Sequence, residues 1–204
     1  RRECVGESRC SFGEECFTVK RRLEAQEADI VVTNHAMLAI DALEGIPVLP
    51  EHCAVIIDEG HELVDRATAA VTSELNVPMI EKALSRSRKH VDSRTHEMLQ
   101  EAAEDLDGCL RATAESLSGP TQLKPVGGDI TLALTVIRDA CHQAITEINA
   151  DKEGKDPDSL AAKQHARGAI EEVHDTAGAL LAGNEFDVVW LDPGEGRSPS
   201  LKLA

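Results

Sequence analysis

The chain has 204 residues and a formal net charge of −16, and 42% of its residues are hydrophobic but only 2% are aromatic. This aliphatic composition favours packed helices over an all-β sandwich, and so few aromatic rings disfavour a protein that binds single strands by stacking their bases. The acidic charge opposes nucleic-acid binding over most of the surface, and no apolar run approaches the ~18 residues of a membrane-spanning helix.

Three of the six cysteines lie in the first sixteen residues, as Cys4, Cys10 and Cys16. Clustered cysteines without a secretory signal are typical of metal or iron–sulphur ligands rather than disulfides. Structural zinc more often uses CxxC pairs, which do not occur here, so the spacing favours an iron–sulphur cluster. A four-iron cluster needs a fourth ligand, which is either absent or upstream. The other cysteines are interpreted as free core thiols, because Cys53 begins a predicted buried strand and Cys109 and Cys141 lie on predicted apolar helix faces.

The next segment has the pattern of a helix followed by a βαβ unit. Residues 17–27 are charged and lack β-branched runs, which predicts a helix. Residues 28–33 (ADIVVT) and 53–58 (CAVIID) are apolar runs of strand type. Between them, Asn34 is a helix cap, and a helix is expected from His35 to about Leu43. Strands this apolar are typical of a parallel sheet that is covered on both faces.

An acidic pair follows the second predicted strand directly, in the sequence VIIDEGH at residues 55–61. An apolar strand that delivers Asp58 and Glu59 at its carboxyl end has the Walker B arrangement. There the first acid holds the Mg²⁺ of a nucleoside triphosphate and the second polarises the attacking water. Two solvated acids at the end of a surface strand are the alternative. The added His61, two positions after Glu59, makes the pattern rarer and favours Walker B.

The middle of the chain changes to helical periodicity. Helices are expected over residues 78–92 and 94–117, from Asp129 onwards, and from Pro157 to Gly183, and four such helices should pack as a bundle. Residues 187–191 and 200–203 then alternate across a Pro-Gly turn and predict a hairpin. The sequence therefore indicates an α/β fold that is interrupted by a large helical insertion and then resumes.

Basic residues gather at the start of the helical region, although the chain as a whole is acidic. Between residues 82 and 94 a single Asp92 stands among five of them, and acidic residues follow immediately. A local basic patch and an ordinary solvated helix face explain this equally well. The basic residues are Lys82, Arg86, Arg88, Lys89 and Arg94.

The motifs together resemble one family. The three early cysteines, then ADIVVTNHAML, then VIIDEGHEL, and the closing DVVWLDPGEGRSPSLKLA closely resemble the DinG branch of the XPD-like superfamily 2 iron–sulphur DNA helicases. The resemblance covers both ends of the chain, whereas the middle matches only in being helical and in the right place. It implies part of a P-loop (RecA-like) motor domain whose sheet is interrupted by a four-helix Arch-like subdomain.

The resemblance also implies domain bounds and roles for individual residues. Residues 1–20 would be an incomplete iron–sulphur segment, 21–65 and 184–204 parts of motor domain 1, and 66–183 the Arch-like insertion. Cys4, Cys10 and Cys16 would hold a [4Fe–4S] cluster with a fourth ligand upstream. Asp58, Glu59, Gly60 and His61 would be the DEAH box, with Asp58 on Mg²⁺ and Gly60 where the family has Ala. Candidate DNA-binding residues are Asn34, His35, Arg86, Arg88 and Lys89.

The resemblance further implies the activity, the partners and the location of the longer protein. Such a helicase moves 5′ to 3′ on single-stranded DNA and unwinds forked duplexes with ATP, as a monomer at the bacterial nucleoid in the cytoplasm, in DNA repair or replication. Because the sequence starts at Arg1 rather than Met, we expect a piece of that protein. The phosphate-binding motif GxxxxGK[ST] does not occur in it, so the chain alone should not hydrolyse ATP.

Two other interpretations stay open. One is a non-catalytic, zinc-binding interaction module with a helical bundle, in which the DEGH sequence is accidental. The other is a different P-loop ATPase with an acidic helical insertion and no cluster. An iron–sulphur cluster gives a brown protein with broad visible absorption and zinc gives a colourless one, so purification under anaerobic conditions distinguishes the first interpretation from a helicase.

Overall fold

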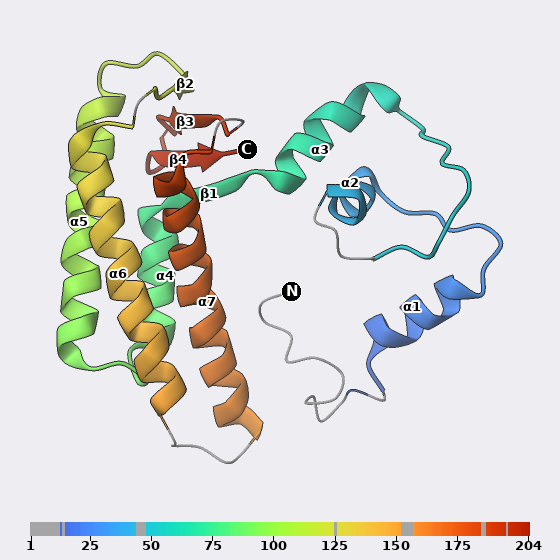
Figure 1. The fold of residues 1–204 in the computed structure, drawn as a ribbon, viewed down its shortest axis with the longest axis horizontal. Helices are drawn as coiled ribbons and strands as arrows, with labels where there is room; N and C mark the ends of the chain where they lie inside the picture. Colours follow the sequence, from blue (N-terminus) through green and yellow to red (C-terminus); the bar gives the residue numbers. More distant parts are fainter. Residues whose placement is uncertain are drawn as a thin grey trace. The chain divides into compact units, whose positions relative to one another are not determined.

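A computed structural model describes residues 13, 15–43, 48–124, 126–151, 157–184, 187–194 and 196–204 (Figure 1). In these ranges the fold is mixed α/β, mostly helical, with one small antiparallel sheet. The chain divides into two compact units, and the boundary falls between Thr72 and Ser73.

The larger unit contains the four predicted helices, α4 (Val77–Ser87), α5 (Ser93–Ala114), α6 (Gly128–Ala150) and α7 (Pro157–Ala182). Helix α4 packs on α5, α5 on α6, α6 on α7, and α7 on α4, so the four lie side by side as a bundle (Figure 1). This confirms the prediction of a bundle. Its core consists of aliphatic and alanine side chains, as the composition indicates.

Local sequence sets where two of these helices begin. The side chain of Asn76 accepts a hydrogen bond from the Met79 amide at 2.9 Å, and Pro78 lies in the first turn of α4. At α5, Asp92 Oδ1 accepts from the Thr95 amide at 2.7 Å. Both side chains satisfy donors that a helix leaves unpaired at its first turn. The pKa of Asp92 is lowered, chiefly by this amide, because the hydrogen bond favours the charged carboxylate.

A sheet of four strands belongs to the same unit, in the order β1-β4-β3-β2. Strands β3 (Val189–Asp192) and β4 (Ser200–Leu203) form the predicted hairpin, with β2 (Thr121–Gln122) beside β3. Strand β1 (Ser73–Asn76) pairs antiparallel with β4, and it was not predicted. Its single leucine is fully buried against the hairpin, in a row made by Leu75, Leu201 and Leu191.

The smaller unit contains α1 (Phe17–Gln26), α2 (His35–Leu43), the 3₁₀ turn η2 (Gly60–Glu62) and α3 (Leu63–Val71), with α2 packed on α3. The predictions of α1 and α2 are confirmed.

Among the helices that the structure describes in either unit, none is long and apolar enough to cross a membrane.

The predicted strands at 28–33 and 53–58 are wrong for this structure. Both segments are described throughout, and neither forms a strand. Their apolar side chains face solvent, with Ile30 exposed by 84%, Val32 by 92% and Ile56 by 97%. A buried strand needs a hydrogen-bonding neighbour and cover on both faces. The described part of this unit supplies neither, so the apolar pattern alone does not produce the βαβ unit.

Candidate functional site

The four residues of the DEGH sequence form a tight turn between an extended segment and α3. Glu59 has φ 48° and ψ 44°, the left-handed region, and it is the single non-glycine residue of the described ranges with positive φ. Such a conformation costs roughly 1–2 kcal/mol for a residue with a side chain. Two hydrogen bonds hold it: the Glu59 amide donates to Asp58 Oδ1 at 2.9 Å, and its carbonyl accepts from the Glu62 amide at 2.9 Å. Strain of this kind gathers at functional sites.

The side chains of the turn are open to a ligand. Glu59 is exposed by 68% and His61 by 74%, with 3.3 Å between Glu59 Oε2 and His61 Nδ1. Asp58 is also exposed, and one of its oxygens is used by the Glu59 amide. Carboxylate oxygens are the donors that Mg²⁺ prefers, and it uses one or two of them together with water and phosphate oxygens. Asp58 and Glu59 therefore fit the donor chemistry of such a site.

Helix α2 is tied directly to this turn. His35 Nε2 donates a hydrogen bond to the Asp58 carbonyl oxygen at 3.0 Å. Asn34 caps the helix, since its side-chain oxygen accepts from the Met37 amide at 2.9 Å. Asn34 and His35 were singled out as candidates for DNA contact. The structure shows what each does within the chain: Asn34 begins α2, and His35 joins α2 to the acidic turn.

Gly60 has space for a larger side chain. A Cβ atom built on it would meet Ile57 Cγ2 at 3.9 Å, an ordinary van der Waals contact, and its φ is not in the left-handed region. The alanine of a DEAH sequence would therefore fit this turn without displacing a neighbour.

Of the cysteines predicted to bind a cluster, the structure describes only Cys16. Cys4 and Cys10 lie outside the described residues. Cys16 is half-buried at the start of α1, and its carbonyl accepts from the Lys20 amide at 3.0 Å. In the described ranges no three His, Cys, Asp or Glu residues converge to hold a metal ion. The [4Fe–4S] cluster stays a prediction.

The interpretation of the other three cysteines as core thiols is confirmed for one of them. Cys141 is fully buried, and burial raises its pKa to about 12, so it stays a neutral thiol. Cys109 is half-buried, and burial also raises its pKa. Cys53 is exposed, contrary to prediction, because the strand that would bury it does not form.

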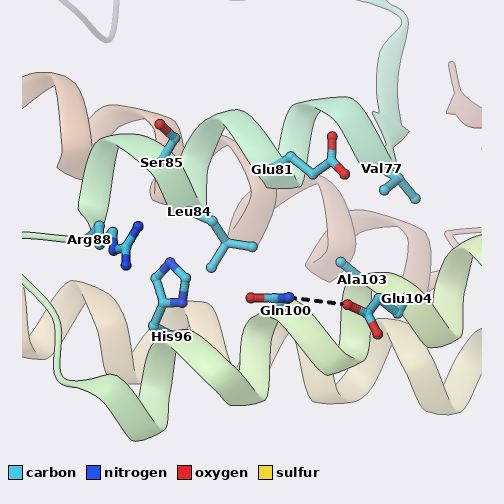
Figure 2. Close-up of a pocket in the computed structure, with 9 residues that line it drawn as sticks. All are labelled: Val77, Glu81, Leu84, Ser85, Arg88, His96, Gln100, Ala103 and Glu104. Carbon is cyan, nitrogen blue, oxygen red and sulfur yellow. Dashed lines mark hydrogen bonds between the residues drawn. The ribbon is translucent and has the colours of Figure 1, made fainter.

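The basic candidates lie at the end of α4. Arg86 is in its last turn and Arg88 is its C-cap, a position where positive charge is stabilised by the helix dipole. Figure 2 shows Arg88 and His96 close together at one end of a groove of about 330 Å³ between α4 and α5, with Glu81 and Glu104 toward the other end. The sequence does not predict the groove. Its two sides come from different helices, and no sequence motif indicates how those helices pack on each other.

Several curated proteins that align with this chain are named ATP-dependent helicases. They bear the name DinG: the "ATP-dependent helicase DinG" of Mycobacterium tuberculosis H37Rv is 47% identical over 102 residues, which are 50% of this chain and 15% of that protein. The "ATP-dependent DNA helicase DinG" of Salmonella typhimurium LT2 is 49% identical over 65 residues, 30% of this chain and 9% of that protein. The Shigella flexneri protein of the same name is 45% identical over 74 residues, 34% of this chain and 10% of that protein. No family model matches.

These similarities confirm the resemblance to DinG-type helicases that the motifs indicate. The aligned part of this chain spans 15% of the length of the mycobacterial relatives. The relatives that bear this name are therefore several times longer than the part that aligns.

Proposed function

We propose that this chain is part of an ATP-dependent DNA helicase that moves 5′ to 3′ along single-stranded DNA and unwinds forked duplexes, in DNA repair or replication. The observation that carries the proposal is the 47% identity to proteins named ATP-dependent helicase DinG over half of the chain. The proposal includes a monomer that works at the bacterial nucleoid, in the cytoplasm. It also includes residues 66–183 as the Arch-like insertion between parts of motor domain 1.

In this proposal the acidic turn is the Walker B site. Bound Mg²⁺·ATP would supply the phosphoryl group, and the positive charge of the metal would neutralise the negative charge of the phosphates. Asp58 would hold the metal through its carboxylate, and Glu59 would orient the attacking water. The exposed carboxylate of Glu59, set on a strained turn with His61 Nδ1 3.3 Å away, supports this division of roles. His61 then links the state of the nucleotide to the DNA or to the second motor domain.

In the same proposal, the cysteines and the basic residues contribute to DNA binding. Cys4, Cys10 and Cys16, with one further cysteine upstream, would hold a [4Fe–4S] cluster, and its binding would supply the folding free energy of a short segment. The basic end of α4, with Arg86, Arg88 and Lys89, is a candidate for phosphate contacts. The exposed positions of Arg88 and Lys89 support it, whereas the acidic residues at the other end of the groove limit such contacts to this end.

The test is Glu59→Gln in a longer protein that contains this sequence and a phosphate-binding loop. DNA-stimulated ATP turnover should fall by about 10²-fold or more, because the carboxylate that positions water is lost. ATP affinity should stay within a few-fold, because phosphate and metal contacts elsewhere provide most of it. The measurements are steady-state turnover and nucleotide binding on the same preparation.

Glu62→Gln is the matched control. Glu62 is an acid on the adjoining 3₁₀ turn that pairs with Arg66 at 3.1 Å, and it has no part in the proposed chemistry. This variant should keep its turnover. If Glu59→Gln also turns over ATP within a few-fold of the parent, the Walker B assignment is wrong.

A further inference from the structure

Two histidines meet across the neighbouring helices α6 and α7. His142 on α6 and His174 on α7 have their ring centroids 6.0 Å apart, with an angle of 36° between the ring planes. His142 is exposed, and the side chain of His174 is exposed by 29%. Solvent and dissolved ions therefore have access to the pair. The DEGH turn and the cysteine cluster make no use of either residue.

A carboxylate fixes one of the two rings. His174 Nδ1 lies 3.0 Å from Asp175 Oδ1. When Nδ1 carries the proton and donates it to Asp175, the lone pair of the neutral ring is on Nε2. Histidines that bind metals in proteins are commonly held in this way, with the other nitrogen donating to a carboxylate. The hydrogen bond thus prepares His174 Nε2 as a ligand atom.

We propose that His142 and His174 together bind one divalent transition-metal ion of the zinc class, with Asp175 as a positioning residue. Zinc–nitrogen bonds are about 2.0–2.1 Å long, so two imidazoles on one tetrahedral ion have centroids about 5 Å apart. The observed 6.0 Å needs about 1 Å of approach, which rotation of two accessible side chains provides. Imidazole nitrogen suits Zn²⁺, Ni²⁺ and Cu²⁺, and does not suit Mg²⁺ or Ca²⁺.

Water completes the coordination, because no third protein ligand converges on the pair among the residues that the structure describes. The site is therefore an exchangeable one. A metal that joins α6 to α7 binds the folded bundle and not the unfolded chain, so it raises the stability of the bundle as its concentration increases.

The test is a ZnCl₂ titration of the full chain, followed by NMR of its eight histidine rings. Cys4, Cys10 and Cys16 are changed to Ser so that the early cysteines do not compete for the ion. The ring signals of His142 and His174 should shift together and saturate at one equivalent of zinc, and the melting temperature should rise. His142→Ala and His174→Ala should each abolish the saturable shift of the remaining ring. Asp175→Asn should weaken binding by about 10-fold or more.

His165→Ala is the control, because His165 is an exposed histidine on the same helix α7. It should leave the titration unchanged. Circular dichroism shows that each variant is folded. If the two rings do not respond to zinc up to millimolar concentration, or if His142→Ala responds like the parent, the pair is a ring contact only and the proposal fails.

Discussion

His35 donates a hydrogen bond from Nε2 to the carbonyl oxygen of Asp58, 3.0 Å away and 23 positions later in the chain. The contact fixes the residue that directly precedes the left-handed Glu59. A strained turn persists only when its surroundings hold it. His35 therefore supports the conformation in which Glu59 presents its carboxylate.

Replacing His35 with Ala should loosen the acidic turn. Loss of one partly exposed hydrogen bond costs roughly 0.5–1.5 kcal/mol, and about 1 kcal/mol corresponds to roughly fivefold faster local opening. Hydrogen exchange at the Glu59 and Glu62 amides should accelerate by this factor. The Met37 amide should not change, because Asn34 caps α2 independently.

His35→Gln is the conservative variant, because its amide can still donate to the Asp58 carbonyl. It should restore much of the protection. His52→Ala is a second control, since His52 contacts only the Pro50 carbonyl, at 2.9 Å, among the hydrogen bonds seen for it. Equal exchange in His35→Ala and His52→Ala would show that the contact does not hold the turn.

The turn between β3 and β4 depends on Gly194. Its φ is +67°, and a Cβ atom there would lie 2.7 Å from the Ser198 carbonyl oxygen. Gly194→Ala should therefore lower the free energy of unfolding by more than the roughly 1–2 kcal/mol that a left-handed conformation costs, because the backbone has to move as well. Gly196 is the matched control, with φ +75° and open space around it, so Gly196→Ala should lose the backbone cost alone. Urea unfolding measures the free energy of unfolding of both variants, and equal losses of stability would contradict the clash at Gly194.

Asp192 makes the stability of the hairpin depend on pH. Its pKa is lowered from 3.8, first by the hydrogen bond from Lys202 Nζ at 2.7 Å and then by the Gly194 amide. Because the folded pKa lies below the unfolded one, this stabilisation is present above pH 3.8 and is lost as the pH falls through the folded value. Asp192→Asn keeps the acceptor for Gly194 but removes the charge.

Between pH 5 and 7 the Asp192→Asn variant should be less stable than the parent by about 0.5–1 kcal/mol, the range of a partly exposed ion pair. The difference should shrink once the pH falls below 3.8. Urea midpoints at a series of pH values measure it. A difference that grows toward low pH would have the wrong sign and would reject this role of Asp192.

Cys10 is the residue that tests the predicted cluster. If the proposed function holds, Cys10→Ser in a longer helicase that contains this sequence removes a soft thiolate, so the cluster should be lost or destabilised. The segment from Cys4 to Cys16 has only Val5 and Phe12 as internal apolar residues besides its cysteines. In the proposed function, metal binding would therefore supply the folding free energy of this segment. Iron content, visible absorption and unwinding should all fall, whereas ATP turnover should persist at a reduced rate that DNA stimulates poorly.

Cys109→Ser is the comparison for that experiment, because Cys109 is a half-buried thiol of α5 with a raised pKa. It should keep iron and unwinding. Wild-type iron content together with continued unwinding in Cys10→Ser would show that Cys10 is not a ligand. Zinc in place of iron in the parent protein would favour the interaction-module interpretation.

The sequence by itself determined the features that depend on neighbours along the chain. The four helices of the bundle follow from apolar periodicity, α1 from a charged stretch without β-branched runs, and α2 from the cap that Asn34 provides. The hairpin follows from alternation across the Pro193-Gly194 turn. These elements depend on contacts within a few residues, so a local pattern is enough to predict them.

Tertiary structure alone decided which segments became strands. Residues 53–58 are more apolar than β1, yet they do not form a strand, because a strand requires a second strand from elsewhere in the chain to bond with. β1 has one apolar leucine and forms a strand because β4 offers an open edge and a place to bury Leu75. The links between His35 and Asp58 and between His142 and His174 are of the same kind. They join residues far apart in sequence, and only packing in three dimensions brings such residues together.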